Sequence, residues 1–528
     1  MHNQVPFKNF EHLNQNPDWM QSCLYFACYL SYATIPYYRL VKGIVVRLHR
    51  ILGLLLLAAP ASMASPWIGT NDESLHQDLT TLVEFQVIDA VAISYPVPWR
   101  GIDRQLTAIE VHSLPEPAKR AARRLLHYLK HRQADGLYQM TSLNIASDPV
   151  RFESVAGSYG QKEQLSHQVE VVSGRWSAKL SANMIDEGEL NLDNSYVAMH
   201  VGGWVLKAGA TDQFWGPAND SSLMLSTNAR PIPTVGLFRG SAVESESPWL
   251  SWLGPWYASA EIGQFRDPRD VDGAKLWRAR FTAKPLKGLT LGMSWAAMWG
   301  GAGQPDSLGD LLDVLTFQTQ CIDDLPTCDE ELNTTTGNHL AGFDLSYSFM
   351  LLQRPVTLYA QRIGEDAKDY KVTDNANLFG ISTYLGPLKF YMESSDTNIA
   401  CNGDGNPATN CFYEHSTYTS GYRHYRRAVG SSYDSDADQT TVGVQWRGES
   451  GQSAMLKLAQ IELNPDGLKP SPVLTDGVSE DIKLVSGYYQ QPLGNFLIKV
   501  GAEYQDRELG DRQESDVAVF VDLRYVWL

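Results

Sequence analysis

The sequence predicts an all-β transmembrane barrel that follows a small, mostly helical N-terminal segment. Three features support this prediction: an amphipathic final strand, many earlier segments with a period of two, and an apparent secretory signal. Closing such strands into a barrel pairs their backbone groups, which the bilayer requires. A water-soluble β-sandwich is the alternative, but it explains neither the C-terminus nor the aromatic content of 11%.

The final strand, residues 517–528, has one wholly apolar face. Successive side chains of a strand point to opposite sides of the sheet. One side holds Val517, Val519, Val521, Leu523, Tyr525 and Trp527, and the other includes Asp522 and Arg524. An apolar face that ends in two aromatics is typical of a lipid-facing strand with an interfacial girdle. An edge strand of a soluble sheet is the other interpretation.

Alternating segments recur from about residue 150 onward. Examples are Ala341, Phe343, Leu345, Tyr347 and Phe349, then Val442, Val444 and Trp446, then Phe496, Ile498, Val500, Ala502 and Tyr504. Turn-rich pieces such as residues 464–467 separate these segments, and no helical pattern lies between them. The pattern predicts an antiparallel meander.

The N-terminus resembles a secretory signal. Lys42, Arg47 and Arg50 precede an apolar run over residues 51–59, which is too short for a bilayer span of about 20 residues. Small residues follow, and we expect cleavage after Ala64. Since about forty residues precede this signal, we expect synthesis to begin near Val41.

We therefore divide the chain into three parts. Residues 1–64 are an upstream extension with the signal peptide, residues 65–145 a helical periplasmic segment, and residues 146–528 the outer-membrane barrel. Export to the bacterial outer membrane follows from this division.

The charge balance opposes nucleic acid as a partner. The chain has 43 basic and 60 acidic residues, for a net charge of −17. Local basic clusters would still allow an acidic ligand, because the net charge does not set the local potential.

Four cysteines follow the signal, as the local pairs Cys321 and Cys328, and Cys401 and Cys411. Each pair lies in a polar stretch, and an oxidising compartment favours two loop disulfides. A zinc site is the alternative, although neither spacing is Cys-x2-Cys. We expect no metal and no cofactor.

Several long motifs resemble one family. Residues 214–223 read Phe-Trp-Gly-Pro-Ala-Asn-Asp-Ser-Ser-Leu, and residues 248–256 read Pro-Trp-Leu-Ser-Trp-Leu-Gly-Pro-Trp. Further matches are residues 226–231, 299–301, 341–344, 361–366, 413–415 and 421–423. These motifs are similar to those of the Wzi capsule-assembly family, and the likeness covers most of residues 70–528.

The resemblance implies a barrel of about eighteen strands with a periplasmic helical bundle. It also implies capsule or exopolysaccharide assembly by lectin-like binding, with attachment of the polymer to the cell surface. The implied partners are capsular or extracellular polysaccharide, outer-membrane lipid and the polysaccharide export machinery, and we expect a monomer.

Residues 413–427 are the first candidate binding segment, because aromatics and cations alternate there. Its candidates are Tyr413, His415, Tyr422, Arg423, Tyr425 and Arg426. Arginine binds carboxylates of an acidic polymer in a bidentate manner, and a disulfide just before the segment would preorganise it. An aromatic girdle or an internal charge ladder is the alternative.

A second candidate set comprises Trp215, Arg230 and Arg239, where the family likeness is strongest. The Gly216-Pro217 pair and the prolines at 231 and 233 suggest a shaped turn. A structural role in a plug or a bulge is therefore an equal alternative.

The sequence contains no Gly-x-Ser-x-Gly elbow, no His-Glu-x-x-His and no Walker loop. We therefore expect a non-catalytic protein that binds acidic polysaccharide. A porin-like channel for sugars or polysaccharide is the alternative.

Overall fold

The computed structural model describes residues 66–70, 72–134, 137–153, 157–245, 247–316, 337–368, 371–399, 401–403, 406–408, 411–467 and 478–527. The predicted signal peptide and upstream extension lie outside these residues, as do Cys321 and Cys328. None of the helices in the described residues is both long and apolar enough to cross a bilayer.

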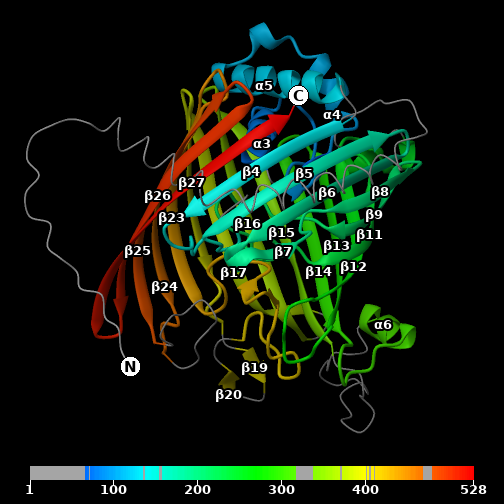
Figure 1. The fold of residues 1–528 in the computed structure, drawn as a ribbon. Helices are drawn as coiled ribbons and strands as arrows, with labels where there is room; N and C mark the ends of the chain where they lie inside the picture. The colour runs from blue at the N-terminus through cyan, green and yellow to red at the C-terminus, as the bar shows by residue number, and fades with distance from the viewer. Residues whose placement is uncertain are drawn as a thin grey trace, which may run out of the picture. The chain divides into compact units, whose positions relative to one another are not determined.

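In the described chain, eighteen antiparallel strands close into a barrel, and the short β7 pairs beside β6 (Figure 1). They are β4 (Leu137–Ala146), β5 (Glu163–Ser173), β6 (Trp176–Ile185), β7 (Glu189–Asn191), β8 (Tyr196–Val201), β9 (Trp204–Ala210), β11 (Pro233–Arg239), β12 (Trp256–Gln264), β13 (Lys275–Leu286), β14 (Leu289–Trp299), β15 (Asn338–Leu351), β16 (Arg354–Lys368), β17 (Lys371–Leu385), β18 (Leu388–Asp396), β23 (Ala437–Arg447), β24 (Ser453–Leu463), β25 (Glu480–Leu493), β26 (Phe496–Leu509) and β27 (Arg512–Trp527). Pairing of β27 with β4 joins the last strand to the first. The predicted fold class is confirmed.

The barrel begins earlier than the sequence predicted. We expected the helical segment to extend to residue 145, but β4 starts at Leu137 and is fully paired with β5 and β27. The boundary therefore lies between Ala134, where the last helix of the segment ends, and Leu137. The apolar and polar residues of β4 alternate only weakly, because its inner face is polar and its outer face includes Gln139 and Thr141. The sequence pattern therefore did not predict this strand.

The outer surface matches the predicted apolar faces. Val517 is 59% exposed, Trp527 50% and Phe343 60%, although all three are apolar. Asp522 and Arg524 of the same strand pair with each other at 2.7 Å on the inner side. Because apolar side chains face lipid and polar ones face the lumen, the alternation specifies which face of each strand points to lipid and which points to the lumen.

A helical segment closes one end of the barrel. It comprises α3 (Glu73–Glu84), α4 (Ile102–Thr107), η1 (Val111–Ser113) and α5 (Glu116–Ala134), with the short strands β1 (Trp67–Ile68), β2 (Ser94–Tyr95) and β3 (Val97–Pro98). Helix α5 buries Ala118, Ala121, Leu125 and Leu129, whose spacing of three to four residues forms one face of a helix.

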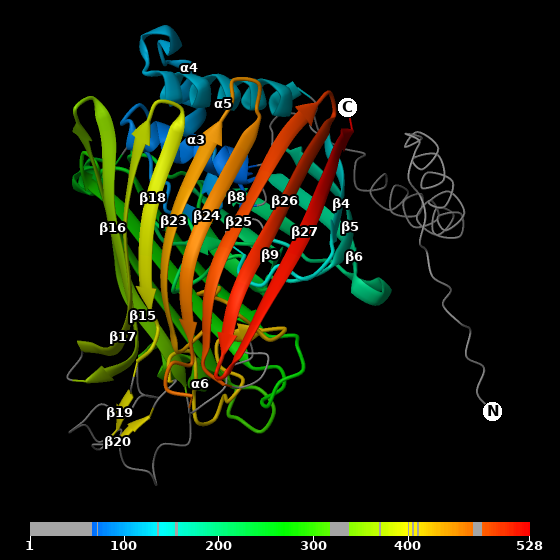
Figure 2. The ribbon, with the colours of Figure 1, turned by 90° about the vertical axis from the view of Figure 1, so that its left-hand side faces the viewer.

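Figure 2 shows α3, α4 and α5 at one end, with α6 (Leu308–Leu315), β19 (Cys401–Gly403) and β20 (Asn406–Ala408) at the other. Short strand connections such as residues 202–203 and 494–495 lie at the helical end, and the long connections 211–232 and 397–436 lie at the other end. In outer-membrane barrels short turns are periplasmic and long loops extracellular. We therefore call the helical end periplasmic and the opposite end outer.

Parts of two long connections at the outer end fold into the lumen. Residues 211–232 join β9 to β11 and contain β10 (Phe214–Trp215), and residues 397–436 join β18 to β23. We call residues 211–232 and 411–436 the plug. Its buried side chains form one apolar cluster with the inner wall, which includes Leu223, Phe412 and Tyr359.

The plug meets the helical segment inside the barrel. Strand β10 pairs with β2, which places Trp215 opposite Ser94, and Gly216 donates to the carbonyl of Ile93 at 3.1 Å. The inner-wall Arg280 pairs with Asp344 and donates to the Ser94 hydroxyl at 2.9 Å. Protein from both ends thus joins within the lumen.

Candidate functional site

Trp215 is part of the plug–helix junction rather than a surface residue. Its ring is 1% exposed, and its indole N–H donates to Oε1 of Gln213 at 3.1 Å. The side chain has no access to an external polymer in this conformation. Of the two interpretations that the sequence left open, the geometry agrees with the structural one.

The base of the candidate segment is buried. The Tyr413 hydroxyl donates to the carbonyl of Leu223 at 2.5 Å, and the Tyr422 hydroxyl donates to the carbonyl of Asn338 at 2.6 Å. Both tyrosines are at most 1% exposed. They join the plug to itself and to the barrel wall, so the structure does not place them where sugars could reach them.

Arg423 is an internal charge. Its guanidinium contacts Asp434 at 2.5 Å and Glu414 at 2.6 Å, and it is almost completely buried. Burial alone would lower the pKa of Arg423, but the carboxylates of Asp434 and Glu414 raise it overall. Because Asp434 and Glu414 already occupy its guanidinium, Arg423 cannot also pair with a carboxylate of the polymer.

His415 is a neutral acceptor. Its Nδ1 accepts the backbone N–H groups of Thr417 and Tyr418 at 3.1 and 3.3 Å. Burial lowers the pKa of His415 to about 4, so the ring carries no charge at neutral pH. It stabilises a turn and offers no cation.

Arg239 lies at the other end of the barrel from the candidate segment. It ends β11 and donates to the carbonyl oxygens of Ser241 and Val243, both at 2.9 Å. Its guanidinium stacks 3.8 Å from the Trp256 ring centroid. The sequence grouped it with Trp215 and Arg230, but the structure separates them.

The tip of the candidate segment differs from its base. Strands β21 (Arg423–His424) and β22 (Arg427–Ala428) form a hairpin with Tyr425 and Arg426 as its two-residue loop. Both loop residues have positive φ, 51° and 65°. This geometry matches a type I′ turn, in which Asn-Gly is usual. Two large L-residues at positive φ store strain, and such strain concentrates at functional sites.

Contacts from other loops brace the tip. The Arg230 guanidinium lies 3.9 Å from the Tyr425 ring centroid, and Asp267 accepts the Tyr425 backbone N–H at 3.2 Å. Arg230 is itself held by Asp193 at 2.6 Å and by Glu189 at 3.0 Å. The tip is therefore fixed before any ligand arrives.

Arg266 joins this region, although no sequence pattern singled it out. Its backbone N–H donates to Nε2 of His424 at 3.3 Å, so its segment lies against the hairpin. Arg266 and Arg426 are both exposed, and neither forms an ion pair within the described residues. We call Arg230, Arg266, Tyr425 and Arg426 the outer patch.

The remaining site predictions concern metals and disulfides. No group of three or more His, Cys, Asp or Glu in the described part of the chain is arranged to hold a metal ion. Cys411 is disulfide-bonded. The side chain of Cys401 lies outside what the structure describes, as do both residues of the Cys321 and Cys328 pair, so these pairings stay predictions.

The family model for the capsule assembly protein Wzi matches residues 142–519. The chain belongs to the Wzi family.

A protein of Klebsiella pneumoniae described as an uncharacterised 55.8 kDa protein in the cps region is 28% identical over 369 residues. The match covers 67% of this chain and 69% of that protein.

Among solved structures, Escherichia coli Wzi matches with a TM-score of 0.74 at 22% identity, over 87% of this chain and 99% of that one. It is described as an outer membrane protein involved in group 1 capsule assembly and a carbohydrate-binding β-barrel. Pseudomonas aeruginosa OccK3 has a TM-score of 0.41 at 12% identity, over 74% and 94%. The first likeness confirms the fold. Fold and family together assign this Wzi-family chain to the bacterial outer membrane and to capsule assembly.

Proposed function

We propose that this protein holds acidic capsular or extracellular polysaccharide at the cell surface by non-catalytic binding at the outer patch. The observation that carries the proposal is the braced hairpin tip, with the adjacent Arg266, above a filled barrel. It agrees with the carbohydrate binding described for Escherichia coli Wzi.

The filled lumen favours binding over conduction. Residues from the outer end and from the periplasmic end meet at Trp215 and Ser94, and Lys457 of the wall pairs with Asp220 of the plug at 3.0 Å. A polymer strand would have to displace both segments to pass. The porin-like alternative therefore has no support from this geometry.

The outer patch has the chemistry that an acidic sugar polymer needs. Arg266 and Arg426 offer exposed guanidinium groups that pair with uronate or other carboxylates. Tyr425 adds an aromatic ring beside them, and its fixed position lowers the ordering cost of binding. Arg230 contributes mainly to positioning, because two carboxylates already neutralise it.

The same region argues for binding without catalysis. Glycoside hydrolysis needs two carboxylates about 5–10 Å apart on either side of one sugar bond. Near the patch, Asp193 holds Arg230 and Asp267 accepts the Tyr425 N–H. These carboxylates serve the scaffold.

The export route belongs to the same proposal. Cleavage after Ala64, insertion into outer-membrane lipid as a monomer and delivery of polymer by the export machinery are its expected steps. N-terminal sequencing of the mature chain checks the cleavage site, and a start other than Ser65 would contradict it.

The test of function compares cell-bound with released polysaccharide in a deletion strain complemented with variants. We expect Arg266→Gln with Arg426→Gln to raise the released fraction several-fold, close to that of the deletion. Arg512→Gln is the matched control, because Arg512 is an exposed arginine at the outer end, where it begins β27.

Heat-modifiability on electrophoresis shows that each variant is folded. If the double variant retains polymer like the wild type, the outer patch is not the binding site. If the deletion itself releases no polymer, the retention function is wrong. Conductance in planar bilayers should stay at background.

A further inference from the structure

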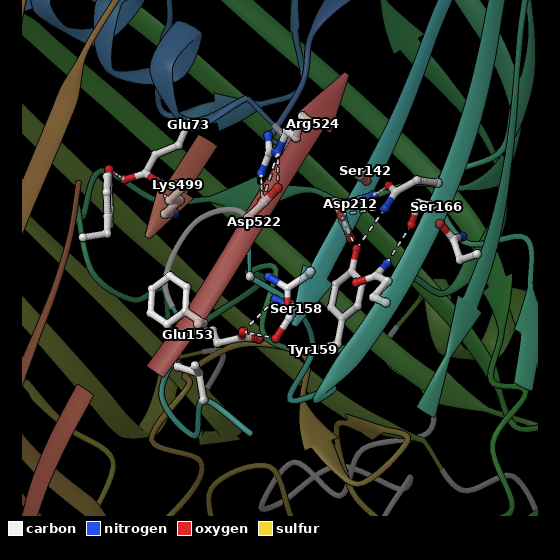
Figure 3. Close-up of a pocket in the computed structure, with 18 of the residues that line it drawn as sticks. Glu73, Ser142, Glu153, Ser158, Tyr159, Ser166, Asp212, Lys499, Asp522 and Arg524 are labelled. Atoms are coloured by element: carbon white, nitrogen blue, oxygen red, sulfur yellow. Dashed lines mark hydrogen bonds and ion pairs between the residues drawn. The ribbon is translucent and has the colours of Figure 1, made fainter. Parts of the chain in front are cut away.

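A polar cavity lies inside the barrel, and no residue of the outer patch lines it. It is about 170 Å³ and is bounded by the inner faces of β4, β5 and β6, by residues of the β4–β5 connection, including Tyr159, and by residues of α3 and of β24–β27. A second cavity of about 110 Å³ shares Gln168, Asn194 and Asp212 with it. Figure 3 shows side chains from the wall and from the connection pointing into the larger space.

The wall of this cavity is a grid of uncharged polar groups. Ser142 of β4 is in register with Ser166 of β5, which is in register with Asn183 of β6. One step along, Gln168 is in register with Ser181. Neighbouring strands lie about 4.8 Å apart and same-face residues about 7 Å apart. Hydroxyl and amide groups therefore repeat at distances that suit the hydroxyls of a sugar ring.

Some of these groups have no protein partner. Gln168 is 9% exposed and lines both cavities, and its side-chain amide forms no hydrogen bond with any described residue. The side chains of Ser142 and Asn144 also lack a hydrogen-bond partner within the described chain. Because a polar side chain inside a protein is normally hydrogen-bonded, these three groups on the cavity lining point to a ligand or water in the cavity.

Charged side chains on the lining of the larger cavity already have partners. Asp522 binds Arg524 at 2.7 Å, Lys499 binds Glu73 at 3.3 Å, Lys457 binds Asp220 at 3.0 Å, Glu153 accepts the N–H of Ser158 at 2.6 Å, and Asp212 accepts the hydroxyl of Tyr159 at 2.5 Å. A charged ligand would find no free counter-charge there. An uncharged ligand rich in hydroxyls would match the free groups.

Another part of the barrel wall differs from the wall of this cavity. On β12 and β13, Glu261 pairs with Arg278 at 3.0 Å, and the Gln213 side-chain amide of the plug donates to Glu261 at 2.7 Å. That part is charged, paired and filled by the plug. At the larger cavity, β4, β5 and β6 contribute only uncharged side chains to the lining, whereas Glu170 and Lys179 line the neighbouring cavity.

We propose that the β4–β6 cavity binds an uncharged sugar unit through Gln168, Ser142 and Asn144. The site shares no residue with the outer patch and does not depend on an acidic polymer. The ring of Tyr159 lies on its lining, where it can contact sugar C–H groups.

The test uses the purified full-length mature protein in detergent. Saturation-transfer NMR measures binding of D-glucose, D-galactose, D-mannose and N-acetyl-D-glucosamine, with D-glucuronate as the charged comparison. We expect at least one neutral sugar to bind the wild type, and to bind at least tenfold more weakly after Gln168→Leu.

The matched control is Gln139→Leu, the same substitution on the outer face of β4, where Gln139 is in register with Val169. It should bind sugar like the wild type. Ser142→Leu fills the same cavity from β4 and provides a second variant if Gln168→Leu does not fold.

Three outcomes overturn this proposal. They are no binding of any of the four neutral sugars to the wild type, unchanged binding in both cavity variants, and tighter binding of D-glucuronate than of the neutral sugars. If only the variant with Arg266→Gln and Arg426→Gln lost binding, the sugar would bind at the outer patch, which would also contradict the proposal. Polymer retention by cells is measured separately, so either proposal can fail alone.

Discussion

The base and the tip of one segment, residues 413–427, have the same composition and opposite roles. At the base, Tyr413, Tyr422 and Arg423 are buried and fully bonded within the plug. At the tip, Tyr425 is half-buried and Arg426 is exposed, both at positive φ. The difference lies in the partners that the fold of the plug brings to each position, namely Asp434 and Glu414 at the base.

The largest effect should come from removing the buried ion pair at the base of the segment. Arg423→Ala leaves Asp434 buried without its counter-charge, and removing one partner of a buried ion pair costs about 3–5 kcal/mol. We expect the plug to become sensitive to protease while the barrel stays heat-modifiable. Arg426→Ala, three residues away, should leave protease resistance unchanged. Equal resistance of the two variants would show that base and tip do not differ as described.

The next largest effect should come from acidification, which should destabilise the buried part of residues 413–427. Burial lowers the pKa of His415 from 6.5 to about 4, so between these values the unfolded plug binds more protons than the folded one. The contribution of neutral His415 to the folding free energy of the plug is complete above pH 6.5. It is lost as the pH falls towards 4, and the total loss is at most about 3 kcal/mol. Limited proteolysis of the plug across this range measures the effect. His415→Gln should flatten the profile, and an unaltered profile would contradict the assignment.

The smallest and most specific effect concerns the tip. Replacing Tyr425 and Arg426 by Asn and Gly should relieve strain and stabilise the hairpin by roughly 1–2 kcal/mol. Polymer retention should fall at the same time, because the exposed guanidinium and the ring are lost. Thermal unfolding and cell-bound polysaccharide measure the two effects. A variant that is less stable, or that retains polymer fully, would remove the link between strain and binding.

Much of the barrel could be predicted because lipid imposes a simple rule on each strand. Phe343, Val517 and Trp527 were expected on the outer face, and they are exposed there. Strand β4 was missed since its outer face carries Gln139 and Thr141, which dilute the apolar pattern. The boundary error of nine residues has this single cause.

The candidate site was harder to predict because burial of arginine and tyrosine depends on the tertiary fold of the plug, even where a partner is close in the sequence, as Asp434 is to Arg423. Arg423 and Arg426 look alike in the sequence, yet only one of them faces a buried carboxylate. Arg266 was missed because it approaches the hairpin through a backbone contact with His424, about 160 residues away. Likewise, only the tertiary structure shows that the plug leaves space beside Gln168, so that its side-chain amide has no partner there.

By itself the sequence determined the transmembrane barrel, its lipid-facing positions and its family, since alternation and long motifs are local properties of the chain. Only the tertiary structure decided which cations are exposed, where the lumen is filled and where it stays open. Those outcomes depend on how segments pack in three dimensions, some of them hundreds of residues apart, and such packing leaves no local pattern in the chain.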